Sequence, residues 1–348
     1  MKMTFRWYGD EDPVTLDKIR QIPGMTGVVT AVYSVPAGDV WPQEEISRMK
    51  AAVQAKGLEM EVIESVPVHE DIKLRRGNYQ TYIENYKENI RRLAKAGVKC
   101  ICYNFMPVFD WTRSRLDQPL PDGSNALVYY KEDVGKMDPT KLALPGWDAS
   151  YSPEEMAGLI AAYQEQGEEG LWESLNHFLQ EIMPVAVECD VNMAIHPDDP
   201  PWPIFGIPRI ITCEENIDRF LSLYDDPHHG LTLCSGSLGC TASNDYAQMV
   251  RKYGAMGRIH FAHVRNVKIL ADGSFEESAH YSPCGSLDVV EILKAYHDVN
   301  FQGYLRPDHG RMIWGETGKP GYGLYDRALG AMYMTGIWET LDKLKGEK

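Results

Sequence analysis

Four segments in the second half of the chain each carry a side chain that binds transition metals. The segments VNMAIHPDDPP, LTLCSGS, RIHFAHVRNVK and GYLRPDHGR contain His196, Cys234, His260 and Asp308. Imidazole, thiolate and carboxylate groups bind Zn²⁺, Fe²⁺ and Mn²⁺ alike, so the residue types do not select one ion. Structural zinc sites use more thiolates, whereas a mixed set leaves positions on the ion for a substrate. The sequence therefore predicts a catalytic metal centre with these four ligands, and His263 is the alternative to His260.

Three arginines flank the last two of these segments. Arg265, Arg306 and Arg311 are each able to hold a carboxylate through two hydrogen bonds. Arg75 and Arg76 follow the third predicted strand and are either further contacts to the same site or an ordinary solvated pair. An anionic substrate needs such local cations, because the net charge of the chain is −15.

Proton carriers lie close to the predicted ligands. His309 directly follows Asp308 and cannot easily share its face, so a general acid or base is its natural role. Tyr322 and Tyr325 lie in the segment GKPGYGLYDR, at the start of the last predicted helix. A tyrosine near a cation can exchange protons, and packing at the helix start is the other interpretation. His263 and Tyr325 are also expected to contact the substrate.

A metal ion, a carboxylate clamp and an acid/base pair together suit the removal of a proton next to a carboxylate or carbonyl group. The outcome depends on the following step. If the proton returns at another position, the enzyme is an isomerase or an epimerase. If the neighbouring hydroxyl leaves instead, the enzyme is a dehydratase. The residue types alone do not decide between these reactions.

Short β-like runs alternate with longer helical patterns along the chain, which is typical of a parallel α/β fold. Eight such runs are predicted, which is the number that closes a (β/α)8 TIM barrel. The strands are expected at 3–7, 27–33, 59–66, 98–105, 191–196, 231–235, 259–266 and 304–308. In such a barrel the carboxyl ends of the strands converge on one mouth, so the candidate residues would meet there.

The alternation of side chains predicts which of them point into the barrel. In the fifth and sixth strands the bulky residues occupy one face, which leaves His196 and Cys234 on the inward face. In the seventh strand Ile259 and Phe261 are the bulky residues and are expected to point outward. By this argument His260 points inward and is the ligand.

One connection is much longer than a βα unit requires. About 85 residues separate the fourth and fifth predicted strands, where roughly 30 are enough. We expect one barrel domain over residues 1–348, with an insertion and helices at 106–190 over the carboxyl mouth. Residues 106–149 show little periodicity and are interpreted as a lid or a subunit contact, or as a surface decoration.

Composition excludes several classes. An excess of 50 acidic over 35 basic residues argues against a nucleic-acid partner. The start MKMTFRWYGDEDPV lacks the apolar run of a signal peptide, and no stretch is long enough for a membrane helix. The seven cysteines are scattered without a CxxC pair, so a reducing, cytoplasmic location is expected.

Six segments together resemble mannonate dehydratase of hexuronate degradation. They are MTFRWYGDEDPV, IHPDDPPWPIFGIPRI, LCSGSLG, HFAHVRNV, LRPDHGR and GYGLYDRALG, and they span essentially the whole chain. The resemblance implies a metal-dependent barrel of the xylose-isomerase-like group. The implied reaction removes water from D-mannonate to give 2-dehydro-3-deoxy-D-gluconate with Mn²⁺ or Fe²⁺.

Carried onto this sequence, the resemblance implies His196, Cys234, His260 and Asp308 as metal ligands. It implies His309 and Tyr322 as the acid/base pair, with a homodimer or a higher homo-oligomer. The competing functions are a sugar or sugar-acid isomerase or epimerase, an apurinic endonuclease, and a non-catalytic sugar-acid binding protein. The negative charge disfavours the nuclease, and the presence of the acid/base residues disfavours pure binding.

Overall fold

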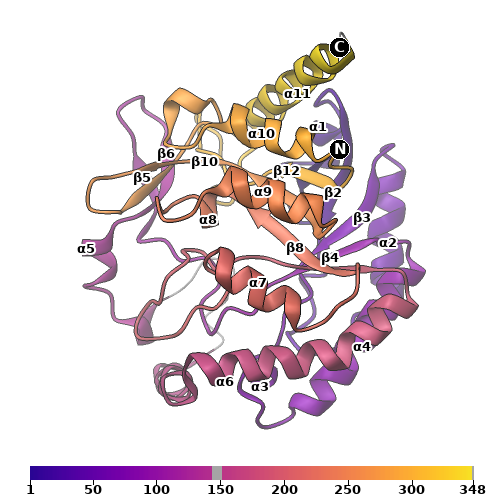
Figure 1. The fold of residues 1–348 in the computed structure, drawn as a ribbon, viewed down its shortest axis with the longest axis vertical. Coiled ribbons are helices and arrows are strands. Elements are labelled where there is room, and N and C mark those ends of the chain that lie inside the picture. Colours follow the sequence, from indigo (N-terminus) through magenta and orange to yellow (C-terminus); the bar gives the residue numbers. More distant parts are fainter. Residues whose placement is uncertain (143–150, 347–348) are drawn as a thin grey trace.

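The computed structural model describes residues 1–142 and 151–346 and contains a closed barrel of eight parallel strands (Figure 1). The strand order around the barrel is β1-β12-β9-β8-β7-β4-β3-β2. The strands are β1 (Lys2–Arg6), β2 (Met25–Thr30), β3 (Glu59–Glu64), β4 (Cys100–Tyr103), β7 (Asn192–Ile195), β8 (His229–Cys234), β9 (Ile259–Val264) and β12 (Tyr304–Pro307). The predicted TIM barrel is thus confirmed, with every predicted strand present.

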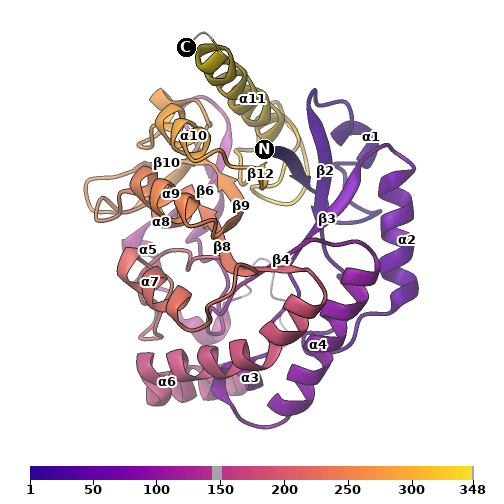
Figure 2. The same ribbon diagram turned by 45° about the vertical axis from the view of Figure 1, so that its right-hand side comes forward.

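Helices surround this barrel and cover the outward faces of its strands (Figure 2). The longer helices are α2 (Gln43–Gln54), α4 (Tyr79–Lys95), α6 (Pro153–Glu188), α7 (Glu214–Ser222), α9 (Tyr246–Ala255), α10 (Val289–Asp298) and α11 (Tyr325–Gly346). The shorter ones are α1 (Leu16–Ile19), α3 (Glu70–Leu74), α5 (Lys131–Val134), α8 (Ser235–Leu238) and the 3₁₀ turns η1 (Pro139–Lys141) and η2 (Ser282–Cys284). None of the helices in the described part of the chain is long and apolar enough to cross a membrane.

Two of these helices show how the sequence determines their shape. In α4, Ile83, Tyr86 and Ile90 recur at three- and four-residue spacing, and all three are buried. Helix α6 begins at a capping box between Ser152 and Glu155. Its regular geometry is interrupted at Gly167, where φ is +67°, a conformation that glycine adopts without strain. The long insertion ends in this helix, which packs against α3 and α4.

The register of β9 shows which of its side chains enter the barrel. Phe261 lies opposite Tyr304, and His263 lies opposite Cys234. Phe261 and Tyr304 belong to a small apolar cluster contributed by six barrel strands, which fills the barrel interior. Because side chains alternate, His263 points inward with Phe261, and His260 points outward. The expected direction of β9 is therefore wrong.

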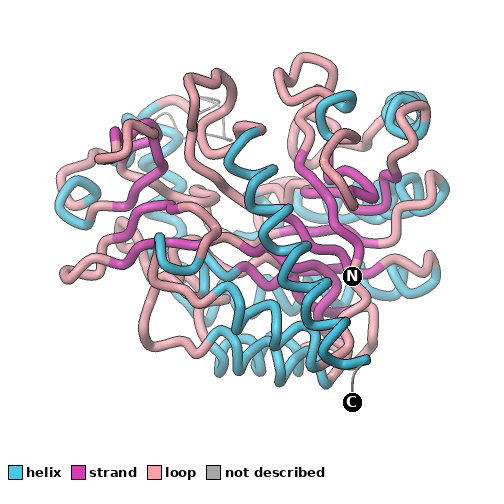
Figure 3. The backbone as a smooth tube through the Cα atoms, turned by 90° about the horizontal axis from the view of Figure 1, so that it is seen from above, coloured by secondary structure: helices cyan, strands magenta, loops and turns pink. Residues whose placement is uncertain are grey.

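A second sheet of four antiparallel strands stands beside the mouth of the barrel. It consists of β5 (Arg115–Pro119), β6 (Asn125–Tyr129), β10 (Asn266–Ile269) and β11 (Phe275–Ser278), in the order β10-β11-β6-β5. Figure 1 places β5, β6 and β10 together, and Figure 3 shows strands of both sheets from above. The sheet joins the insertion after β4 to the hairpin that follows β9. This pairing was not predicted, because residues 106–149 lack an alternating pattern.

Candidate metal and proton-transfer site

A cavity of about 590 Å³ opens at the carboxyl ends of the barrel strands. Residues that end or directly follow six different strands line it, among them Glu64, His196, Arg306 and Asp308. The loop before α11 contributes Tyr322. The mouth of the barrel is therefore the place where the predicted chemistry-bearing residues meet.

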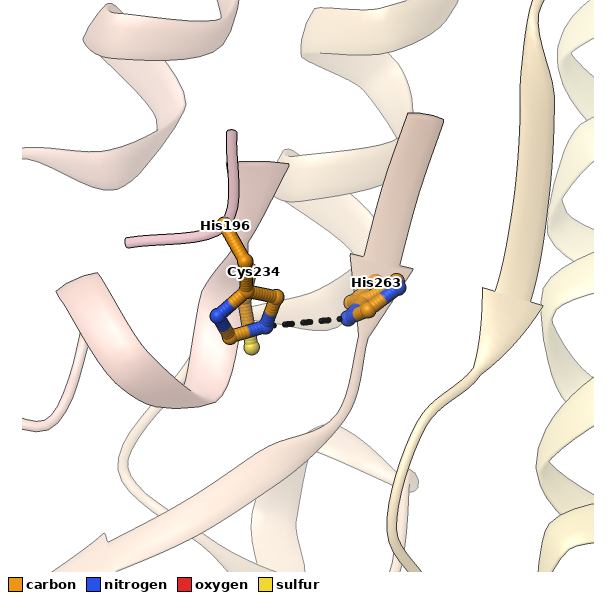
Figure 4. Close-up of side chains that lie close together, drawn as sticks. All are labelled: His196, Cys234 and His263. Atoms are coloured by element: carbon orange, nitrogen blue, oxygen red, sulfur yellow. Dashed lines mark hydrogen bonds between the residues drawn. The ribbon is translucent and has the colours of Figure 1, made fainter. Parts of the chain in front are cut away.

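Three metal-binding side chains lie together at this mouth. His196, Cys234 and His263 each offer a ligand atom, and these atoms all lie within 4.8 Å of one another (Figure 4). Nε2 of His196 is 3.2 Å from Nδ1 of His263. Asp308 is the fourth neighbour, with Oδ2 at 3.4 Å from Sγ of Cys234 and Oδ1 at 3.7 Å from Nδ1 of His263. Two nitrogens, one sulfur and a carboxylate thus converge from four adjacent strands.

The surroundings keep the Asp308 carboxyl ionised, as a metal ligand must be. Burial on its own raises the pKa of Asp308. The positive charge of Arg306 outweighs this effect, together with smaller contributions from His309, His263 and Arg265, and holds the pKa well below its ordinary value. Nη2 of Arg306 lies 2.7 Å from Oδ1 of the carboxylate.

His260 does not join this cluster. It lies near the amino end of β9, where its ring donates a hydrogen bond to the backbone carbonyl of Pro227. Burial lowers the pKa of His260 to about 4. The pairing of β9 with β8 slips by one residue between Leu231 and Thr232, and the barrel interior accommodates the large ring of Phe261. The rule that bulky residues face the outer helices fails here because the interior holds Phe261.

The predicted acid/base residues form a pair on one wall of the cavity. Nε2 of His309 lies 2.9 Å from the hydroxyl of Tyr322, and both side chains are buried while lining the cavity. Burial lowers the pKa of His309, and burial also raises the pKa of Tyr322 to about 12. Near neutral pH both groups are therefore neutral in this arrangement, and a proton is able to pass between them.

The predicted substrate contacts separate into different environments. Arg306 is buried, lines the cavity and forms ion pairs with Glu64 and Asp308. Arg265 is also buried but lies behind the cavity wall, where it forms ion pairs with Asp199 and Asp308 and donates to Glu277.

The other predicted contacts lie outside the cavity lining. Arg311 forms ion pairs with Asp122 and Asp326. Tyr325 is exposed at the start of α11 and packs on Trp314. The pair Arg75 and Arg76 is exposed at the end of α3. The structure thus brings Arg306 to the cavity and leaves these four residues away from it.

Sequence reasoning missed part of the cavity. Arg6 and Tyr8 at the end of β1, Glu64 at the end of β3 and Lys319 before α11 all line it. Nζ of Lys319 lies 4.1 Å from the ring centre of Tyr8, whose ring meets that of Tyr322 edge-on. A signal was present, because polar residues stand at the carboxyl ends of the first and third strands as they do at the last four. The metal ligands that we predict for the site lie on the last four strands.

Comparison with known proteins agrees with this geometry. The family model of D-mannonate dehydratase (UxuA) matches residues 1–348. Mannonate dehydratase 2 of Halalkalibacterium halodurans is 57% identical over 343 residues, which cover 98% of this chain and 99% of that protein. The mannonate dehydratase of Thermotoga petrophila is 54% identical over 357 residues, with 99% of both proteins covered.

Solved structures give the same result. The crystal structure of mannonate dehydratase from Streptococcus suis serotype 2 superposes with a TM-score of 0.93 at 51% identity, covering 99% of this chain and 96% of that one. A D-psicose 3-epimerase from Clostridium cellulolyticum H10 superposes with a TM-score of 0.60 at 13% identity, over 98% and 99% of the two chains, and shares the fold alone. The resemblance noted in the sequence is confirmed, and the chain belongs to the D-mannonate dehydratase (UxuA) family.

Proposed function

We propose that this lyase removes water from D-mannonate at the mouth of the barrel, using a divalent metal and the pair of His309 and Tyr322. The observation that carries the proposal is the meeting of two chemistries in one cavity. A cluster of metal-binding atoms lies around His196, and a proton-transfer pair lies on the neighbouring wall. A dehydratase acting next to a carboxylate needs both.

The metal ligands are His196, Cys234, His263 and Asp308, so His263 takes the place that the sequence argument gave to His260. The donor set fits a divalent transition metal, because imidazole, thiolate and carboxylate are among the groups that bind Mn²⁺, Fe²⁺ and Zn²⁺. Mn²⁺ or Fe²⁺ is the ion that we propose. When bound, the ion acts as a Lewis acid toward the negative charge that develops on the substrate carboxylate.

His309 and Tyr322 move the protons. One of the two removes the proton from C2 of the substrate, and the other protonates the hydroxyl that leaves C3 as water. The resulting enol then ketonises to 2-dehydro-3-deoxy-D-gluconate. The 2.9 Å contact between Nε2 and the hydroxyl lets the pair exchange a proton and so regain its starting state after each turnover.

Cationic side chains attract the anionic substrate into the cavity. Arg306 pairs with Glu64 and Asp308, and Arg6 also pairs with Glu64. Arg6 and Lys319 extend the positive wall toward Tyr8. We assign these three cations to the substrate side of the site. They provide locally the positive potential that a chain of net charge −15 lacks as a whole.

Three further features complete the proposal. The chain is one barrel domain whose insertion at 106–190 forms part of the cavity wall, because Asp110, Trp111 and Tyr151 line it. The enzyme self-associates as a homodimer or a higher homo-oligomer, supported by the exposed apolar side chains of Trp314 and Leu329. We also propose a cytoplasmic location. All seven cysteines are free thiols, which suits a reducing compartment.

The test is a dehydration assay on protein that has been stripped of metal. D-mannonate and its epimer D-gluconate are supplied with Mn²⁺, Fe²⁺ or Zn²⁺ in turn, and the 2-keto-3-deoxy acid is measured. We expect product from D-mannonate with Mn²⁺ or Fe²⁺. Stoichiometric metal binding without any product would contradict the dehydratase proposal and would favour an isomerase or an epimerase on the same barrel.

A further inference from the structure

We propose that Glu277 is a positioning residue for His309, which it holds through Nδ1 while Nε2 exchanges protons on the cavity side. This inference rests on the proposed role of His309. Glu277 belongs to β11 of the antiparallel sheet and not to the barrel. The inference therefore gives that second sheet a part in the reaction.

His309 contacts Glu277 through one ring nitrogen and Tyr322 through the other. Oε1 of Glu277 is 3.2 Å from Nδ1 of His309, and Nε2 on the other side of the ring is 2.9 Å from the hydroxyl of Tyr322. Glu277 is buried and does not line the cavity, so it acts on the substrate only through His309. A carboxylate in this position fixes both the orientation of the ring and the nitrogen that carries the hydrogen.

Two arginines hold the carboxylate in place. Nη2 of Arg113 donates to Oε1 of Glu277 at 2.8 Å, and Nη1 of Arg265 donates to the same oxygen. Both arginines also bind Asp199, and Arg265 pairs with Asp308 as well, so Glu277 belongs to a buried network of ion pairs. Burial raises the pKa of Glu277, but Arg265, His309 and Arg113 together bring it below its ordinary value. The carboxylate therefore remains an acceptor.

Nη1 of Arg265 also lies within hydrogen-bond distance of Nδ1 of His309 and competes with Glu277 for it. The guanidinium can only donate, so it would favour an Nδ1 without hydrogen. A proton that arrives at Nε2, however, leaves His309 with hydrogens on both nitrogens, and Nδ1 then needs an acceptor. Of these two neighbours, Glu277 alone can accept. The transfer step therefore requires the carboxylate whichever direction the proton takes.

The preceding residue on β11 offers a matched control. Side chains alternate along a strand, and Glu276 turns the other way, where it accepts a hydrogen bond of 2.7 Å from the hydroxyl of Tyr130. Glu276→Gln removes the same charge from the same strand without touching His309. Glu277→Gln removes the charge that faces His309, and Glu277→Asp keeps the charge but withdraws the acceptor by one methylene group.

The experiment is a double-mutant cycle on the metal-loaded enzyme. We expect E277Q to lower kcat by at least about 10²-fold with full metal content, and E276Q to leave it within about threefold of the unchanged enzyme. In the H309N background E277Q should cause no further loss, because the partner through which Glu277 acts is gone. A purely structural role would lower activity in both backgrounds.

Thermal unfolding and metal content of each variant verify that it is folded and loaded. If E277Q does not fold, E277D carries the test, with a smaller loss of kcat that again vanishes in the H309N background. Unchanged kcat in E277Q, or an equal loss in both backgrounds, would overturn this inference alone. Full activity of H309N would overturn the proposed role of His309 itself, so the two failures are distinguishable.

Discussion

Histidines lie at both ends of the barrel, but their surroundings differ. At the amino end, His229 is fully buried and its Nε2 contacts the backbone carbonyl of Phe220 at 3.0 Å, while His260 bonds the backbone of Pro227. At the carboxyl end, His263 meets Cys234, Asp308, Arg306 and His196. Two residues of one strand, Phe261 and Ala262, separate His260 from His263.

The comparison shows that the surroundings of a histidine determine its role. Each amino-end histidine has a backbone partner, and burial lowers the pKa of both to about 4, so these rings stay neutral and help to fill the fold. At the carboxyl end, four strands deliver side chains that are all metal-binding or charged. The direction of β9, and not the residue type, therefore decides which histidine has a functional role.

The largest expected effect separates the two histidines of β9 directly. We expect His263→Ala to lower the affinity for Mn²⁺ by more than about 10²-fold, because removing a ligand costs more than removing a group behind one. His260→Ala is the matched control and should bind the metal like the unchanged enzyme. Calorimetric titration of metal-free protein measures both. An equal loss of Mn²⁺ affinity in the two variants would contradict the assignment of His263 as the metal ligand of β9.

The next effect concerns proton transfer at the carboxyl end. His309→Asn should lower kcat by about 10²–10⁴-fold while the metal content persists, because the variant loses the general acid or base but keeps the ligands. Tyr322→Phe should act in the same direction. Steady-state kinetics, together with elemental analysis of the purified variants, provides the check. Full activity in the first variant would refute its assigned role.

Substitution of Arg306 and Arg311 by lysine tests whether a guanidinium group must line the cavity. Arg306→Lys should lower kcat/KM by about 10–100-fold, the effect of losing one hydrogen bond between charged groups. Arg311→Lys lies outside the cavity lining and should leave kcat/KM within about twofold of the starting value. Initial-rate measurements across substrate concentrations give kcat/KM for both variants. A larger decrease for Arg311→Lys than for Arg306→Lys would contradict the assignment of Arg306 as the substrate contact.

The smallest effect concerns the amino end and the pH dependence of stability. The pKa of His229 is about 4 in the folded protein and about 6.5 when it is exposed on unfolding. Stability contributed by the neutral ring is therefore present above pH 6.5 and is lost as the pH falls toward 4, by on the order of 1–2 kcal/mol at pH 5. Chemical unfolding at pH 7 and pH 5 should show a smaller decrease for His229→Gln. An identical decrease would contradict this explanation.

The sequence predicted the barrel well because each strand combines an apolar run with a turn signal in its own vicinity. Alternation placed His196 and Cys234 on the inward face, and the structure brings them together. The same argument failed for His260, because local pattern does not reveal that Phe261 fills the barrel interior. Register relative to the neighbouring strands determines this, and register is a property of the assembled sheet.

The second sheet could not be predicted from local sequence patterns, because its strands are also defined by their partners. Its central contact pairs Phe275 of β11 with Tyr129 of β6, which lie far apart in the chain. Short strands of this kind are stabilised by the partner and not by their own pattern. The contact between Glu277 and His309 could therefore not be predicted from the sequence. Glu64 could have been predicted, because it is a polar residue at the carboxyl end of β3.

The most direct test of the metal assignment is an anomalous difference map, recorded near the manganese edge from crystals of the Mn²⁺-loaded enzyme. We predict one strong peak bounded by His196, Cys234, His263 and Asp308. Glu64, Cys102 and His263 form the other group of potential ligands in the described part of the chain. A peak among those three residues, or a peak beside His260, would contradict the site on which the proposed reaction depends.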